Sequence, residues 1–139
     1  MSKQASEKKS LLDFLMDNPV DGLTEAVVIS KRLKDYTFTI KAMTGDEFSR
    51  YQSRAMAIGK KNKIDYDNKS FNEQVVLNHT IEPNFKIADD MKKMGCRTPE
   101  EFLYKYLNAG EIQELVKRIT ELSGFDEDEE ELVKEAKND

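Results

Sequence analysis

Residues 36–51, "YTFTIKAMTGDEFSRY", place a strand pattern directly before a helix pattern. In the first half every second residue is large and apolar, which is typical of a strand with one buried face. The predicted buried face carries Tyr36, Phe38 and Ile40. Thr44 and Glu47 then stand at the spacing of a capping box, in which each side chain accepts a hydrogen bond from the other residue's backbone N–H. An amphipathic helix is therefore predicted over residues 44–58.

The strand needs a partner, and "EAVVIS" (residues 25–30) is the nearest candidate. With "KRLKD" (31–35) as the loop, the two strands form an antiparallel hairpin over about residues 25–41. An isolated hairpin is marginally stable in water, so helices or another chain should cover its apolar face. Apolar spacing and helix-start residues predict four further helices in the second half of the chain. These cover about residue 68 to Pro83, 87–95, 98–107 and 111–122.

The segments between these helices are predicted from their composition. Residues 59–70, "GKKNKIDYDNKS", are interpreted as a polar loop, and residues 108–110 are expected to loosen the helical register. Gly124 is expected to end the last helix in the left-handed conformation. Phe125 should then fold back on Ile119, because this type of helix end brings two such apolar residues together.

Length and pattern together define the predicted fold class. A chain of 139 residues is most simply one domain. The fold class is mainly α (α+β), a single compact domain of about five or six short helices with one N-terminal two-stranded antiparallel β-hairpin. The domain is expected over residues 10–125, between a flexible polar leader (1–9) and an acidic C-terminal tail (126–139).

The acidic charge of the chain is concentrated near the C-terminus. The net charge is -5, and residues 124–139 alone carry -6, which leaves +1 for the remainder. This distribution argues against nucleic acid as a partner and favours solubility or a protein partner. The basic cluster "GKKNK" (59–63) is interpreted as a solvated loop rather than a phosphate site, because no aromatic stacking pattern accompanies it.

Few residues of the chain suggest catalysis or metal binding. One His79 and one Cys96 cannot supply the usual four ligands of a zinc site, so both are predicted to serve packing. The chain has no Gly-rich phosphate loop, serine nucleophile elbow or HExxH motif. It also has no signal peptide pattern and no apolar run near the 18 to 20 residues of a membrane helix. We therefore expect a cytosolic, non-enzymatic protein with no cofactor, metal or membrane partner.

The N-terminal stretch "SLLDFLMDNPVDG" (residues 10–22) has large apolar side chains at five of six consecutive positions. These are Leu11, Leu12, Phe14, Leu15 and Met16. Ser10 and Asp13 can cap a helix that Asn18 and Pro19 end. A helix of two turns is too short to be stable alone. Either its apolar residues pack on the hairpin or a helix, or they are a docking segment for a client protein.

Several segments in this order carry a resemblance to a known family. They are the leucine-rich start closed by "NP", the junction "FTIKAMTGDEF", then "EPNF" and "ELSGFDED". Together they resemble the XkdN-like family of phage tail assembly chaperones, which are encoded in tail operons of phages and prophages of Gram-positive bacteria. The resemblance extends from about residue 10 to the end of the chain.

The resemblance implies a non-enzymatic helper of tail assembly. Such a chaperone binds the long, apolar, helical tape measure protein, keeps it soluble and helps to recruit tail tube subunits. It acts in the host cytoplasm and is absent from the mature virion. The five apolar residues of the N-terminal stretch are then the candidate docking residues for this client. The alternative is a small cytosolic adaptor or regulatory protein-binding subunit unrelated to tails, and self-association stays open in either case.

Overall fold

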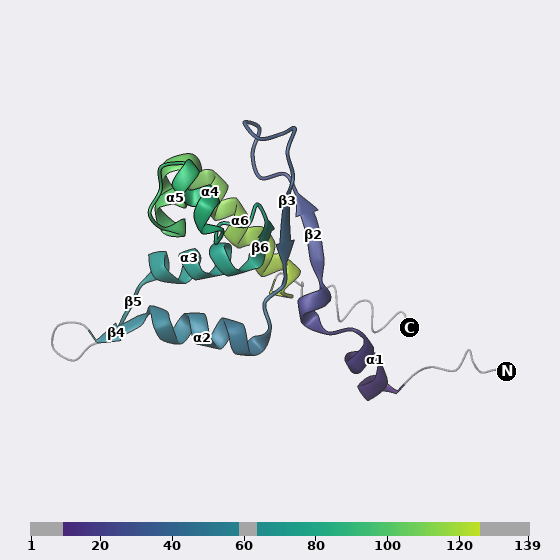
Figure 1. Cartoon of the computed structure of the whole chain (residues 1–139). Helices are drawn as coiled ribbons and strands as arrows, with labels where there is room; N and C mark the ends of the chain where they lie inside the picture. Colours follow the sequence, from purple (N-terminus) through teal and green to yellow (C-terminus); the bar gives the residue numbers. More distant parts are fainter. Residues whose placement is uncertain (1–9, 59–63, 126–139) are drawn as a thin grey trace.

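The computed structural model of the chain describes residues 10–58 and 64–125 (Figure 1). The predicted leader, the lysine cluster and the acidic tail therefore lie outside the described residues. In chain order the elements are α1 (Leu11–Asp17), η1 (Val20–Gly22), β2 (Thr24–Val27), β3 (Phe38–Lys41), α2 (Gly45–Ala55), β4 (Met56–Ile58), β5 (Ile64–Tyr66), α3 (Asn68–His79), β6 (Thr80–Glu82), α4 (Ala88–Lys93), α5 (Pro99–Tyr106) and α6 (Ala109–Leu122).

The main sheet has three antiparallel strands in the order β2, β3, β6. The β2–β3 ladder runs from Val27 opposite Phe38 to Thr24 opposite Lys41. The predicted mainly α class with an N-terminal hairpin is thus confirmed. Strand β6 is an addition that the sequence did not indicate, because three residues are too few for an alternating pattern to show.

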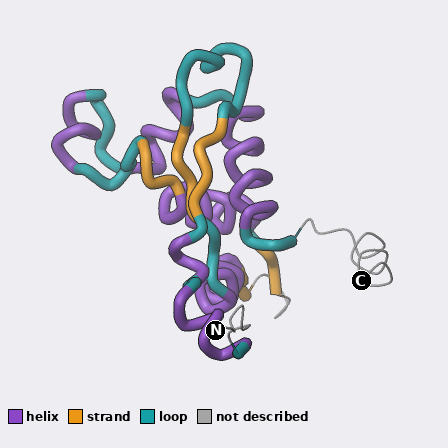
Figure 2. Tube along the Cα trace, turned by 90° about the vertical axis from the view of Figure 1, so that its right-hand side faces the viewer, coloured by secondary structure: helices purple, strands orange, loops and turns teal. Residues whose placement is uncertain are grey.

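The helices cover one side of this sheet. Figure 2 shows β2 and β3 toward the viewer, and α6 contacts both of these strands. Phe38 and Ile40 are 7% and 0% exposed, which confirms them as core residues. The prediction was wrong for Tyr36, which is 66% exposed. The strand begins only at Phe38, where its pairing with Val27 ends the ladder, so Tyr36 belongs to the loop.

The segment after α2 differs from its prediction. The helix ends at Ala55 instead of continuing to residue 58, and Met56 pairs with Tyr66 in a second hairpin formed by β4 and β5. The polar loop predicted over 59–70 is therefore partly β structure. Each of these strands has only three residues and lies beside charged residues. The composition of the segment therefore indicated a polar loop rather than strands.

The helix starts follow the capping signals. Thr44 Oγ1 accepts from the Glu47 N–H at 3.1 Å, and Glu47 Oε1 accepts from the Thr44 N–H at 2.9 Å, which completes the predicted capping box. A second capping box joins Asn108 and Glu111, so α6 begins at Ala109. The expected loosening of residues 108–110 was wrong, because Asn is as good an N-cap as Ser or Thr.

The end of α6 has the predicted left-handed Gly124, whereas the predicted contact of Phe125 with Ile119 stays a prediction. Gly124 has φ +95°, the N–H of Gly124 donates to the Glu121 carbonyl at 3.0 Å, and the N–H of Phe125 donates to the Thr120 carbonyl at 3.3 Å. These two bonds define a Schellman motif. The Phe125 ring lies against Phe48 of α2, with the ring centroids 4.8 Å apart. The end of α6 is thereby joined to α2.

His79 and Cys96 are both buried, as predicted. His79 is 0% exposed, and its Nε2 lies 2.7 Å from the Tyr51 hydroxyl. Burial lowers the pKa of His79 from its ordinary value, although the nearby Glu47 carboxylate opposes this shift. The ring is therefore a neutral member of the core between α2 and α3.

Candidate partner-binding surface

Helix α1 is closed at both ends by side chains of its own segment. Ser10 Oγ accepts a hydrogen bond from the Asp13 N–H at 3.1 Å. At the other end Asn18 Nδ2 donates to the Phe14 carbonyl at 2.9 Å, and Pro19 prevents the helix from continuing. The predicted start and end of this helix are both confirmed.

The apolar side chains of α1 are exposed. No residue of this helix is buried. The exposed fractions are 74% for Leu11, 68% for Leu12, 55% for Phe14, 54% for Leu15 and 71% for Met16. Val20 and Leu23, at 41% and 50%, continue the apolar surface toward β2. We call these seven residues the α1 surface.

The position of α1 explains this exposure. Both views place α1 at the end of the β2–β3 hairpin that is opposite the connecting loop, away from the crossing of α3 and α6 (Figure 1, Figure 2). The five candidate docking residues are therefore brought together on one short helix outside the core.

Such an exposed cluster is unusual in a soluble protein. Burying one Leu, Phe or Met side chain is worth about 1.5 to 3 kcal/mol, and contiguous apolar patches on a surface commonly mark interaction sites. The α1 surface is therefore the part of the described chain best suited to bind an apolar partner.

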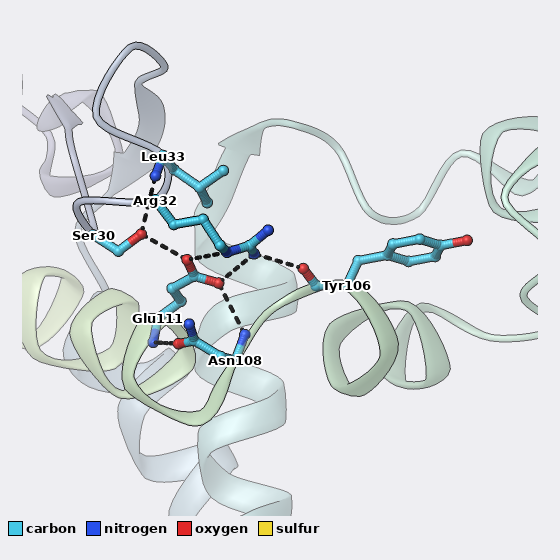
Figure 3. A network of polar contacts seen from close by, with 6 residues as sticks. All are labelled: Ser30, Arg32, Leu33, Tyr106, Asn108 and Glu111. Atoms are coloured by element: carbon cyan, nitrogen blue, oxygen red, sulfur yellow. Dashed lines mark hydrogen bonds and ion pairs between the residues drawn. The ribbon is translucent and has the colours of Figure 1, made fainter.

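A polar network around the buried Glu111 joins the β2–β3 connection to α6 (Figure 3). Glu111 is 0% exposed, and its Oε2 accepts from Ser30 Oγ at 2.6 Å and from Arg32 Nε at 3.0 Å. Its Oε1 accepts from Arg32 Nη2 at 2.6 Å, and the same Nη2 donates to the Tyr106 carbonyl at 2.9 Å. Hydrogen bonds from Arg32, then from Ser30, hold the pKa of Glu111 at about 2 against the opposing effect of burial.

A second ion pair fixes β2 itself. Arg118 Nη2 of α6 lies 3.2 Å from Glu25 Oε2 of β2. The strand that follows the α1 surface is thus attached to α6 by Arg118, and the connection beyond the strand is attached by Glu111. The segment that carries the α1 surface is therefore followed by a strand and a connection that both contact α6.

Reasoning from sequence missed both contacts. Glu111 lies 81 positions from Ser30, and Arg118 lies 93 positions from Glu25, so no local pattern connects them. The capping box of Asn108 and Glu111 was the only available signal, and it indicates a helix start rather than a buried charge.

A cavity of about 570 Å³ lies between α3, α5 and the start of α6. Tyr104 lines it, and Lys69 Nζ lies 4.9 Å from the Tyr104 ring centroid. Burial, and then the Glu73 carboxylate, raise the pKa of the Tyr104 phenol well above its usual range.

Two kinds of feature are absent from residues 10–58 and 64–125. Among them, no group of three or more His, Cys, Asp or Glu side chains is placed to hold a metal ion. Within the same part of the chain, no helix has the length and apolar character that crossing a membrane requires.

Comparisons with known proteins agree with this picture. A sequence model of the family described as phage XkdN-like tail assembly chaperone protein matches residues 11–137. The chain is 28% identical to the uncharacterized protein YqbN of Bacillus subtilis (strain 168) and 26% identical to the phage-like element PBSX protein XkdN of the same strain. Each alignment covers 99% of this chain and 100% of the relative.

A solved structure shares the fold. The crystal structure of the protein YqbN superimposes with a TM-score of 0.62 at 23% sequence identity. The match covers 86% of this chain and 100% of the YqbN chain. The arrangement of short helices around a small antiparallel sheet is therefore found in both proteins.

Proposed function

Because the chain belongs to the XkdN-like family of phage tail assembly chaperones, we propose that it binds the tape measure protein through the α1 surface. The observation that carries this proposal is the exposure of the five apolar residues of α1, between 54% and 74%. A tape measure protein is a long, apolar, helical client, and an apolar helix surface is a complementary partner for it. An adaptor unrelated to tails could use the same exposed residues, but the family match favours the tail assembly chaperone.

The wider role that we propose for this chain is that of a tail assembly chaperone. By covering apolar surface of the tape measure protein, the chaperone keeps that protein soluble and helps to recruit tail tube subunits to it. It acts in the host cytoplasm without catalysing a reaction and is absent from the mature virion. Its action is reversible binding.

The proposal predicts the behaviour of the double variant Leu12→Ser, Phe14→Ser. Two side chains worth about 1.5 to 3 kcal/mol each are removed from the interface, so affinity for the tape measure protein should fall a hundredfold or more. Both side chains are already more than half exposed in the free chain. Stability should therefore change by only about 0.5 kcal/mol. Co-purification with the co-expressed tape measure protein, together with thermal melts by circular dichroism, checks both expectations.

A matched control removes two exposed apolar side chains elsewhere. Val28 and Tyr36, at 43% and 66% exposed, lie beside or within the β2–β3 connection. The variant Val28→Ser, Tyr36→Ser should bind as the wild type does. A Leu12→Ser, Phe14→Ser protein that melts normally and still binds the tape measure protein would refute the proposal. A large loss of stability in that variant would instead show that α1 packs on the domain.

A further inference from the structure

The apolar residues of α1 extend over more than half of the helix circumference. At about 100° per residue, the arc from Phe14 to Met16 spans about 200°. Leu11, Leu15 and Leu12 lie within this arc, and Asp13 and Asp17 occupy the opposite side. A helix that packs on one surface usually needs an apolar stripe of only about 100°. One flat partner surface would therefore leave apolar side chains of α1 in water.

The charged residues that lie beside the α1 surface all have the same sign. Residues 10–23 contain Asp13, Asp17 and Asp21 and no Lys, Arg or His, and all three Asp residues are exposed. A partner that closes over the apolar arc brings its rim close to these carboxylates. Lysine or arginine at that rim is the complementary chemistry.

We propose, on the basis of the proposed function above, that α1 inserts as a guest helix into an apolar groove between two helices of the tape measure protein, with Lys or Arg at the groove rim. The width of the arc requires contact from two sides, and a pair of helices supplies it. The acidic side of α1 faces out of the groove. The chaperone therefore provides the inserted element, and the client provides the groove.

Two other occupants fit the observations less well. A second copy of this chain would offer α1 as a single helix that covers only part of the arc of about 200°, and the charged residues beside that helix are Asp13, Asp17 and Asp21 rather than Lys or Arg. An anionic lipid surface would repel the same carboxylates. The apolar arc and the acidic residues together favour a basic helical partner.

Photo-crosslinking tests the geometry. The photoreactive residue p-benzoylphenylalanine is placed at Phe14 or Met16, the two edges of the arc, in the full chain co-expressed with the tape measure protein. We expect the two positions to label two different helical segments of the tape measure protein. Placement at Asp13, on the acidic side, is the control and should label it several-fold less.

The possible results separate the two proposals. Labelling of the same client residues from both edges, or labelling of a second copy of this chain, would overturn the guest-helix inference. Binding of the tape measure protein without labelling from Phe14 or Met16 would overturn the inference and the use of α1, while the family role stands. Absence of binding would overturn the proposed function as well.

Salt dependence tests the charge. The variant Asp13→Asn, Asp21→Asn keeps Asp17, which also interacts within the chain. Affinity for the tape measure protein should fall about fivefold to tenfold at low salt, and the difference should shrink at high salt because ions screen exposed charges. The variant Asp35→Asn, Asp46→Asn makes the same change in net charge away from α1 and should bind normally. Equal affinity of both variants at every salt concentration would overturn the proposal that Lys or Arg lies at the groove rim.

Discussion

Glu111 is a charged residue in a fully buried position, so its partners determine what it contributes. The Ser30 hydroxyl, the Arg32 guanidinium and the backbone N–H of Asn108 donate to its two oxygens. These bonds stabilise the carboxylate relative to water and keep its pKa at about 2. Because the folded-state pKa lies below the ordinary value of 4.5, the stabilisation is present above about pH 4.5 and is lost as the pH falls toward 2.

The variant Glu111→Gln should lower the free energy of unfolding by about 1.5 to 3 kcal/mol at pH 7, which is the usual contribution of hydrogen bonds to a charged group. Urea unfolding at pH 7 and pH 3 checks this, and the difference between variant and wild type should shrink at pH 3. Glu114→Gln is the control, since Glu114 lies in the same helix with a 32% exposed side chain 3.9 Å from Arg118. A Glu111→Gln protein as stable as Glu114→Gln at pH 7 would contradict the role given to the network.

His79 makes stability depend on pH in a different range. Its folded-state pKa lies below the ordinary 6.5, so the unfolded chain binds the proton more readily. Stability should therefore be full above about pH 6.5 and decrease as the pH falls below that value. The variant His79→Gln should show a smaller difference in melting temperature between pH 7.5 and pH 5.5 than the wild type. An equal difference in both proteins would assign the pH dependence to another group.

For single residues, the sequence predicted whether a side chain is buried better than it predicted which groups that side chain contacts. His79, which was predicted to serve packing, is 0% exposed. The contacts of Glu111 with Ser30 and Arg32 could not be predicted, because these two residues lie about 80 positions away in a connection without regular structure. Only the folded chain brings these groups together.

At the scale of elements, predictions succeeded where a signal is local. The caps at Ser10 and Thr44 each form the predicted hydrogen bond. Strand β6 and the β4–β5 hairpin were missed, since three-residue strands are determined by pairing across the fold rather than by their own pattern. The helix end at Gly124 was predictable, because a left-handed residue favours glycine strongly.

The Schellman end of α6 gives a test of this local control. Gly124→Ala should lower the free energy of unfolding by about 1 to 2 kcal/mol, because the left-handed conformation is unfavourable for a residue with a Cβ. Gly45→Ala is the control, as Gly45 does not have a positive φ. No atom lies within 4 Å of the Cβ that either change would add, so steric contact does not explain a difference. Equal stability of the two variants, measured by urea unfolding, would contradict the assignment.

At the scale of the whole molecule, the core is separate from the surfaces expected to face partners and solvent. The buried apolar residues run from Val27 to Ile119, whereas the α1 surface precedes this range. The acidic tail over residues 126–139 follows it and lies outside the described residues. Whether the α1 surface binds a client could not be predicted from its pattern alone, because the same pattern also fits a buried helix.

Truncation after Phe125 should leave the melting temperature nearly unchanged, because residues 126–139 combine a run of like charges with few apolar side chains. It removes a net charge of -6 and leaves about +1. A net charge near zero promotes association, so the truncated protein should aggregate at lower concentration, as light scattering would show. Changing Asp to Asn and Glu to Gln over residues 126–131 should have the same effect without shortening the chain. Loss of cooperative unfolding on truncation would show that the tail is part of the fold.

The hydrogen bond between Ser30 and Glu111 also has a consequence during protein synthesis. It joins residues 81 positions apart, and ribosomes add about 5 to 20 residues per second. Glu111 is therefore made about 4 to 16 s after Ser30 at that rate. During this interval α1 has already been translated, but the β2–β3 connection cannot yet be fastened to α6. The nascent chain thus exposes the apolar residues of the α1 segment before the rest of the domain can close, and we expect this interval to favour early contact with a client.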